Sequence, residues 1–219
     1  MENNNDKDKA YNYIKKRIVK TELPPGYVLD RSVIADDLGL SITPIREALI
    51  LLAHEGFIDI MPNKGTRVSY IDIDYLKEVS FMRSCLECGV VEHLSLIGLS
   101  GESLSKLRDL SDRQLELVQS GDIQDSYDLD FQFHRLLCDL TGFSSLWDTL
   151  DKYKQHLIRA INCSPLNKRA KQVAVKDHLA IIDAIEERKS NIAKNRMKKH
   201  VNRIVDELQS IPPHFIKTN

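Results

Sequence analysis

The sequence lacks long runs of apolar residues, and this absence bears first on membranes. No stretch of its 219 residues approaches the roughly 20 apolar residues that a membrane-spanning helix needs. The chain starts Met1-Glu-Asn-Asn-Asn-Asp-Lys7, which is polar and unlike a secretory signal peptide. We therefore expect a soluble, cytoplasmic protein with no membrane partner.

The sequence also lacks an excess of one charge. The net charge is −1, and residues 1–70 contain ten Lys and Arg against ten Asp and Glu. A strongly basic domain is the usual electrostatic mark of nucleic-acid binding, and it is absent here. Any phosphate contacts must come from single cations in suitable places. The candidates are Lys15, Lys16, Arg17, Arg31, Arg46, Lys64 and Arg67.

Cysteine is scarce as well. Of the four cysteines, Cys85 and Cys88 form a C-x-x-C pair inside an expected helix, while Cys138 and Cys163 are isolated. A redox or zinc cluster would need a second pair nearby. In a cytosolic chain we therefore interpret these residues as small buried side chains.

What the sequence does contain is a series of short elements between residues 31 and 68. A compact helix ends before Gly39, which supplies the turn. Thr43 is predicted to cap a second helix that begins at Pro44. Four apolar residues spaced for one buried face follow, namely Ile45, Ala48, Leu49 and Leu52. Two short strands joined by a Pro/Asn/Lys/Gly tip complete a winged helix-turn-helix.

This order of elements places one helix in a DNA major groove with a hairpin beside it. The predicted contact residues lie before the helices, on the second helix and at the hairpin tip. They are Arg31, Ser41, Ile42, Thr43, Arg46, Lys64 and Gly65. By pattern alone, a winged helix that contacts another protein remains open as an alternative.

Four motifs in the same region resemble the N-terminal domain of GntR-family bacterial transcription regulators. They are Leu23-Pro-Pro-Gly-Tyr-Val-Leu29, Ile34-Ala-Asp-Asp-Leu-Gly-Leu-Ser41, Thr43-Pro-Ile-Arg-Glu-Ala-Leu49 and Glu55-Gly-Phe-Ile58. The resemblance implies a DNA-binding regulator. Ile42 and Ile50 depart from it, because members of the family usually carry DNA-contacting arginines at these places. Arg46 matches the retained arginine, and Lys64 and Gly65 match the wing tip.

The pattern of the rest of the chain predicts helices. Six are predicted, at 72–98, 102–119, 122–141, 143–162, 168–188 and 190–209, with turn or cap signals between them. The expected fold is therefore mainly α, a winged helix-turn-helix followed by an all-α six-helix bundle. The predicted boundaries are a disordered tail (1–9), a DNA-binding domain (10–71) whose first helix spans 10–20, a helical effector domain (72–210) and a C-terminal tail (211–219).

One carboxylate and three imidazoles within the helical half form a possible metal site. Asp130 and His134 are four residues apart and share one helix face. His178 and His200 lie beside core-facing positions of the fifth and sixth helices. Taken singly, each histidine is a core or surface residue. Together, these donors suit a divalent transition metal and leave coordination positions open.

The same residues resemble the FCD effector domain of the FadR-type branch of that family. The motifs are Arg83-x-x-x-Glu87, Asp130-Phe-Gln-Phe-His134, Asp177-His178-x-x-Ile-Ile-x-Ala-Ile185 and Met197-x-x-His200. Six helices are similar to the VanR-type version of this domain. The resemblance implies that Asp130, His134, His178 and His200 bind a divalent ion, with zinc foremost and nickel, manganese or iron as alternatives.

The resulting hypothesis is a homodimeric repressor that binds a two-fold symmetric double-stranded DNA operator and is controlled by a small organic acid at the metal. Arg83 is a candidate to hold a second carboxylate of the effector, or else it pairs with Glu87. Arg159 is a weaker effector candidate, with a solvated surface arginine as the alternative. Two other functions remain open, a metal-dependent hydrolase and a regulator for which the metal itself is the signal. We expect no enzymatic activity.

Overall fold

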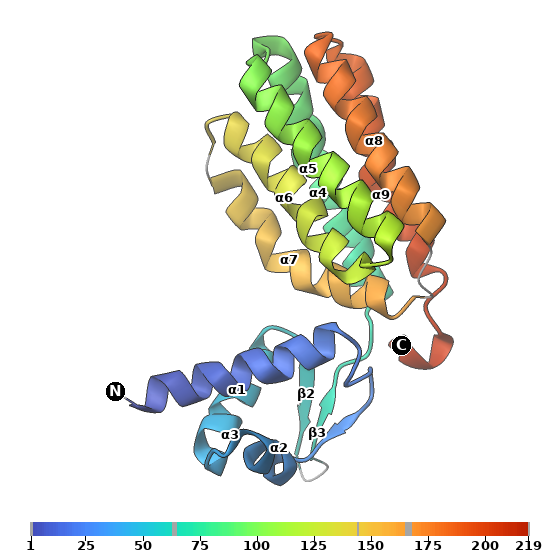
Figure 1. Ribbon diagram of the computed structural model, residues 1–219. Helices are drawn as coiled ribbons and strands as arrows, with labels where there is room; N and C mark the ends of the chain where they lie inside the picture. Colours follow the sequence, from blue (N-terminus) through green and yellow to red (C-terminus); the bar gives the residue numbers. More distant parts are fainter. Residues whose placement is uncertain (1, 63–64, 144, 165–167, 219) are drawn as a thin grey trace. The chain divides into compact units, whose positions relative to one another are not determined.

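The computed structural model describes residues 2–62, 65–143, 145–164 and 168–218, which form two compact units (Figure 1). The first unit comprises the described residues within 1–73, 159–164 and 211–219, and the second those within 74–158 and 165–210. No helix among the described residues is long and apolar enough to cross a membrane.

The first unit contains the predicted winged helix-turn-helix. Its elements are α1 (Glu2–Val19), β1 (Val28–Leu29), α2 (Arg31–Leu38), α3 (Ile42–His54), β2 (Ile58–Met61) and β3 (Gly65–Val68). The strands form an antiparallel sheet in the order β1-β3-β2, in which Arg67 pairs with Val28 on one side and Asp59 on the other. Helix α3 packs against both α1 and α2.

Local chemistry fixes the ends of α2. The Asp30 side chain accepts hydrogen bonds from the backbone N–H groups of Ser32 and Val33, which caps the start of the helix. Gly39 ends it in the left-handed region with φ 64°, where a Cβ atom is disfavoured. Three residues, 39–41, then join α2 to α3, which is the short turn of a helix-turn-helix.

The predicted cap of α3 was wrong by two residues. Ser41, not Thr43, is the N-cap residue, and the helix begins at Ile42. Pro44 is therefore the third helical residue. Because the first four N–H groups of a helix have no intrahelical acceptor, proline is tolerated throughout this turn and does not mark the first position uniquely.

The first helix begins earlier than predicted. The sequence indicated a disordered tail over residues 1–9, but α1 begins at Glu2. Residues 2–9 are mostly Asn and Asp, which have poor helix propensity, so intrinsic preference does not explain this early start. Lys9 donates to the Leu38 carbonyl at 3.1 Å, and Ala10 is fully buried.

The C-terminal tail completes the first unit. Ile71, just after β3, forms a parallel bridge with Ile216. The Ile71 N–H donates to the Phe215 carbonyl at 2.8 Å, and the Lys217 N–H donates to the Ile71 carbonyl at 2.9 Å. A short 3₁₀ turn, η1 (Pro213–Phe215), precedes this bridge.

The second unit is the helical bundle. Its helices are α4 (Ile73–Ile97), α5 (Gly101–Ser120), α6 (Ile123–Leu140), α7 (Ser145–Asn162), α8 (Lys168–Glu186) and α9 (Ser190–Leu208). These six match the predicted helices closely. Ser100 caps α5 by accepting from the Ser103 N–H, and Gly121 ends it in the left-handed region.

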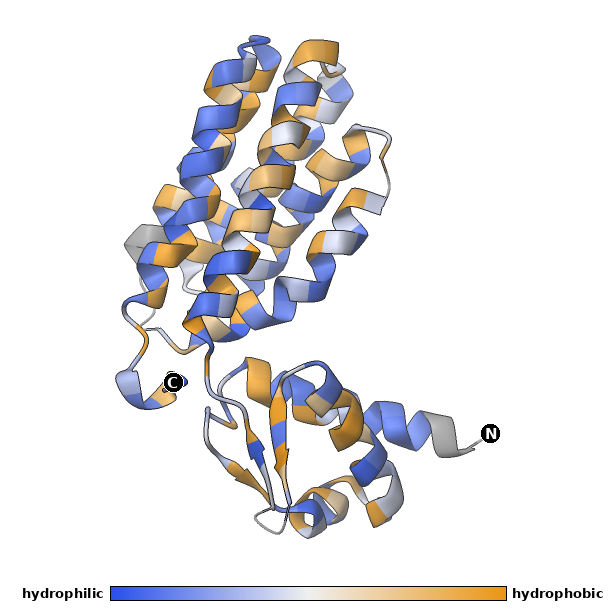
Figure 2. Cartoon of the chain, turned by 180° about the vertical axis from the view of Figure 1, so that it is seen from behind, coloured by the Kyte–Doolittle hydropathy of each residue, from blue (hydrophilic) through white to orange (hydrophobic). Residues whose placement is uncertain are grey.

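Apolar faces hold the bundle together. Helix α5 packs against α6 and α8, and α8 packs against α9. Fully buried side chains include Leu107 on α5, Phe133 and Leu137 on α6, and Ile181 on α8. Apolar and polar residues alternate around the helices (Figure 2), so polar side chains among the buried residues stand out as candidates for function.

Candidate metal centre and nucleic-acid interface

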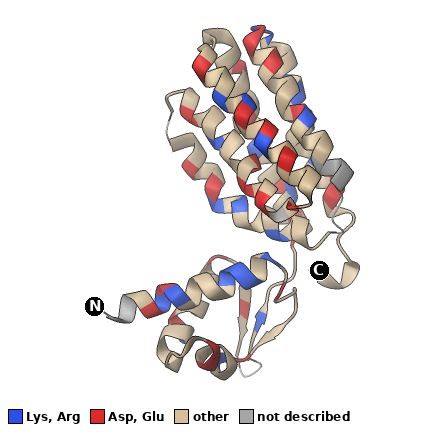
Figure 3. Ribbon diagram, in the orientation of Figure 1, with Lys and Arg blue, Asp and Glu red and all other residues tan. Residues whose placement is uncertain are grey.

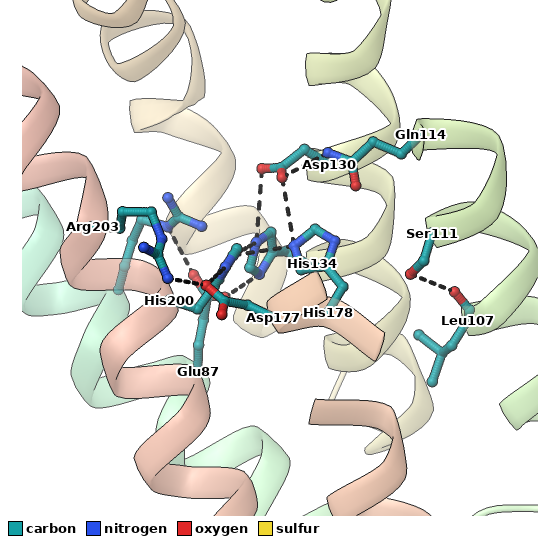
Figure 4. Close-up of polar contacts among 11 residues, drawn as sticks. Glu87, Leu107, Ser111, Gln114, Asp130, His134, Asp177, His178, His200 and Arg203 are labelled. Atoms are coloured by element: carbon teal, nitrogen blue, oxygen red, sulfur yellow. Dashed lines mark hydrogen bonds and ion pairs between the residues drawn. The ribbon is translucent and has the colours of Figure 1, made fainter. Parts of the chain in front are cut away.

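The four ligands predicted from the sequence lie together inside the helical bundle. Asp130 and His134 come from α6, His178 from α8 and His200 from α9, and one ligand atom from each lies within 4.8 Å of the others (Figure 4). The three imidazoles are buried, and the Asp130 side chain is 21 % exposed. Rigid helices therefore bring four donors to one point.

The imidazoles face one another through the same ring nitrogen. His200 Nε2 lies 3.1 Å from His134 Nε2 and 3.1 Å from His178 Nε2. The Asp130 carboxylate lies 3.5 Å from His178 Nε2 and 3.8 Å from His134 Nε2. Neutral imidazoles whose Nε2 lone pairs all point inward repel one another unless a proton or a cation lies between them. This donor set fits a metal ion.

Carboxylates lie behind two of the histidines. The Glu87 carboxylate contacts His134 Nδ1, and Asp177 lies 3.6 Å from His200 Nδ1. Contacts of this kind favour a proton on Nδ1 and leave Nε2 free to bind a metal. His178 Nδ1 has no hydrogen-bond partner among the described residues, but its ring stacks on Phe133 with a centroid distance of 4.0 Å.

The electrostatics also suit metal binding. Burial would raise the pKa of Glu87, but the Arg83 and His134 charges outweigh it and lower the pKa to about 2. Burial opposes ionisation of Asp130 in the same way, and attraction to the three histidines nevertheless holds its pKa well below the usual range. Burial lowers the pKa of His178 and His200. At neutral pH the site therefore combines ionised Asp130 with neutral His178 and His200, the forms in which these groups ligate a metal.

Arg83 takes one of its two predicted roles. Its Nε donates to Glu87 at 2.8 Å, one helical turn along α4, and both side chains are buried. The structure thus has the ion pair between Arg83 and Glu87. Because Glu87 also contacts His134, the Arg83–Glu87 pair is linked to the candidate metal site by that histidine.

Arg159 does not lie where the sequence led us to expect it. The side chain is only 2 % exposed, so it is not a solvated surface arginine. Its guanidinium donates to both the hydroxyl and the carbonyl of Ser69, and burial lowers its pKa to about 10. The end of α7 belongs to the first unit, whereas the four ligands belong to the second. The surface alternative for Arg159 was therefore wrong, and its role as an effector residue stays a prediction.

Three polar neighbours of the site had no assigned role in the sequence analysis. Gln114 on α5 donates to Asp130 at 3.0 Å, and Arg203 on α9 pairs with Asp177. Asp177 precedes His178 in the sequence, so its proximity to the centre was foreseeable, but its position behind His200 was not. Gln114 carries no sequence signal, because its role depends on the packing of α5 against α6.

The candidate DNA contacts form a surface of the first unit. Ser41, Ile42, Thr43 and Arg46 are all exposed. Arg31 is half-buried, and its guanidinium donates to the Thr66 hydroxyl at 3.2 Å. At the wing tip, Gly65 is exposed with φ 90°, and Lys64 lies outside the described residues.

Few of the basic residues here are free to meet phosphate. Lysines and arginines are interspersed with acidic residues (Figure 3). Lys15 pairs with Glu55 at 2.7 Å, and Arg67 pairs with Asp59 at 3.1 Å. Arg46 is the one lysine or arginine of α3, and it has no ion-pair partner within the described part of the chain. Its charge is therefore available to DNA.

Two family models match this chain. The model described as "Bacterial regulatory proteins, gntR family" covers residues 6–68, and the FCD domain model covers residues 78–203. The first therefore spans the winged helix-turn-helix, and the second contains all four clustered ligands.

Relatives of similar length support both matches. An HTH-type transcriptional regulator in an unstable DNA locus of Streptomyces ambofaciens is 31 % identical over 208 residues, which covers 93 % of this chain and 85 % of that protein. The HTH-type transcriptional repressor RspR of Escherichia coli is 25 % identical over 201 residues, covering 92 % of this chain and 88 % of RspR. Among solved structures, Escherichia coli McbR/YncC has the same fold, with a TM-score of 0.73, 18 % identity and coverage of 93 % and 97 %.

Proposed function

Because the chain belongs to the GntR family of transcriptional regulators and carries an FCD domain, we propose that it is a repressor controlled by a small carboxylate at a divalent metal. The observation that carries the metal proposal is the convergence of three imidazole Nε2 atoms and one carboxylate. Repression is proposed because RspR, a relative over most of both chains, is named a repressor.

The chain's own residues determine the charge of the site. Glu87 is paired with Arg83 and Asp177 with Arg203, so Asp130 is the carboxylate whose charge remains for a cation. A divalent ion beside one such carboxylate leaves a net charge near +1. When bound, the ion supplies a Lewis-acidic position that holds a carboxylate oxygen. This charge suits one carboxylate of a small organic acid.

We propose a homodimer as the DNA-binding form. The described DNA-binding surface has few unpaired cations, so a single copy neutralises few phosphates. Two copies on a two-fold symmetric operator double the number of contacts. The dimer would have one conformation that binds the operator and another that does not. An effector changes operator affinity only if it binds one of these two conformations more tightly than the other.

Metal content and effector binding can be measured separately. Elemental analysis of purified protein should find about one equivalent of a zinc-class ion per chain, and His200→Ala should lose it. His93→Ala is the matched control, because His93 is an imidazole of the same unit that contacts the Phe143 ring outside the cluster. Unchanged metal content in His200→Ala would contradict the proposed ligand set.

A regulator that senses the metal alone is the second candidate. Four protein ligands are enough for a closed tetrahedral zinc site. Operator affinity should then respond to metal without any organic acid. The carboxylate proposal instead expects small organic acids to bind the metal-loaded protein and not the chelator-treated one, and to change operator affinity.

We favour a non-enzymatic role over a hydrolase. Glu87 and Asp177 contact the histidines on their Nδ1 side, away from the ring nitrogens that face one another. A general base has to reach a water molecule at the metal itself. Hydrolysis of simple esters or phosphoesters that disappears in His178→Ala would instead favour the enzyme.

A further inference from the structure

One face of α3 exposes two isoleucines with an arginine between them. Ile42, Arg46 and Ile50 are spaced by four residues, so they share a face of the helix. Ile42 is 45 % exposed and Ile50 is 51 % exposed. A water-facing surface that repeats a large β-branched residue across two turns is available for binding.

These isoleucines are not needed for the packing of the first unit. The opposite face of α3 is buried through Ile45, Leu49 and Leu52, each at most 1 % exposed. Helix α3 thus has a complete core-facing stripe without Ile42 and Ile50. Their exposure belongs to the surface that a helix-turn-helix presents to DNA.

The charges on this face favour contact with bases over contact with the phosphate backbone. Glu47, the next residue after Arg46, is exposed beside this face, so the exposed side of α3 carries one arginine and one glutamate. Such a surface attracts phosphates weakly. Of the groups displayed in the major groove, the C5-methyl of thymine is the apolar one. An exposed isoleucine on a recognition helix is complementary to that methyl group.

We propose that Ile42 and Ile50 read thymine methyl groups in the major groove, on either side of a contact made by Arg46. This inference rests on the proposed function as a DNA-binding repressor. Eight residues of helix span about 12 Å, and base pairs are spaced by about 3.4 Å along the DNA axis, so the two thymines are at most about three to four base pairs apart. Base contacts come mainly from the start of a recognition helix, so Ile42, the first residue of α3, makes the larger contribution.

The test compares thymine with uracil. Full-length protein first selects its preferred sites from a random-sequence duplex library, and the selected duplex is then synthesised with deoxyuridine replacing one thymidine at a time. Uracil keeps the hydrogen-bonding groups of thymine and lacks only the methyl. We expect an affinity loss of about fourfold at the thymine that Ile42 contacts, and a smaller loss at the second position.

The matched variants are Ile42→Ala and Ile60→Ala. Ile60 lies on β2 and is 46 % exposed, so it is the same residue type at equal exposure outside α3. Ile42→Ala should bind the thymine and uracil duplexes equally, whereas Ile60→Ala should keep the difference. Both residues are exposed, so both variants should fold, which a thermal melt checks.

The outcomes separate this inference from the proposed function. Selective binding that ignores every uracil substitution would overturn the methyl readout and leave the repressor intact. A change in oligomeric state of Ile42→Ala with an unchanged thymine preference would assign the face to a second copy of the chain. Failure to select any duplex would overturn both proposals.

Discussion

The three histidines of the candidate metal centre have different surroundings on the side away from the cluster. Glu87 contacts His134, Asp177 lies near His200, and His178 has only a stacked phenyl ring among its described neighbours. Outer carboxylates fix the tautomer and raise the basicity of a ligating imidazole. The three candidate ligands are therefore not equivalent, because His134 and His200 each face a carboxylate and His178 does not.

Replacing Glu87 tests this difference. Glu87→Gln keeps the size of the side chain but removes its charge, which leaves Arg83 buried without a counter-ion. We expect metal affinity to fall by about 10–100-fold and the free energy of unfolding to fall by about 3–5 kcal/mol. Calorimetric metal titration and denaturant melts measure the two effects.

The matched control is Glu78→Gln on the same helix. Glu78 is exposed, so the same loss of charge leaves no buried cation behind. Metal affinity and stability should match those of the unsubstituted protein. If Glu78→Gln and Glu87→Gln reduced metal affinity equally, the loss would reflect overall charge and not the contact with His134.

At the residue scale, the sequence predicted which four donor residues cluster better than it predicted their surroundings. Asp130 and His134 are spaced for one helix face, so their proximity follows from helix geometry. Gln114 and Asp177 act through neighbours on other helices. The surface alternative for Arg159 was wrong because nothing in its local sequence shows that its guanidinium is buried against Ser69, 90 residues away.

At the scale of elements, two glycines differ in whether their backbone conformation requires glycine. Gly39 ends α2 with φ 64°, where a Cβ atom is strained even though the space around it is open. Gly89 lies within α4, with nothing within 4 Å of an added Cβ. Gly39→Ala should destabilise by about 1–2 kcal/mol, and Gly89→Ala should stabilise by about 0.5–1 kcal/mol. Denaturant melts of the two variants check the signs.

The same elements show why helix positions were predictable and helix starts were not. The apolar periodicity and the breaks at Gly101 and Gly121 located the bundle helices well. Periodicity carries no information about where a polar first turn begins, and α1 therefore starts at Glu2 instead of residue 10. Likewise, proline fits any position of the first turn, so the motif around Pro44 did not identify Ser41 as the cap.

At the scale of the whole molecule, metal should stabilise one unit and not the other. All four ligands lie in the helical unit, and none lies in the winged-helix unit. Metal at 100 times its dissociation constant adds about 2.7 kcal/mol to the stability of the unit that binds it. Chelation should therefore lower the melting transition of the bundle alone, as followed by hydrogen exchange of α6 and α9. Equal loss of protection in α3 would contradict independent stabilisation.

The C-terminal tail links the end of α9 to the backbone of the winged-helix unit. Residues after Ser210 belong to that unit, where the tail forms two backbone hydrogen bonds with Ile71 and buries Ile211. Each such bond contributes about 1 kcal/mol, and burial of Ile211 contributes about 1.5–3 kcal/mol.

A chain that ends at Ser210 should therefore have a less stable winged-helix unit, with faster exchange of the Ile71 amide and an unchanged bundle. Lys217→Ala is the control, because it removes only the exposed pair with Asp72 and leaves the backbone bonds in place. If the Ile71 amide exchanged as slowly in the truncated chain as in Lys217→Ala, the tail would not stabilise the backbone at Ile71.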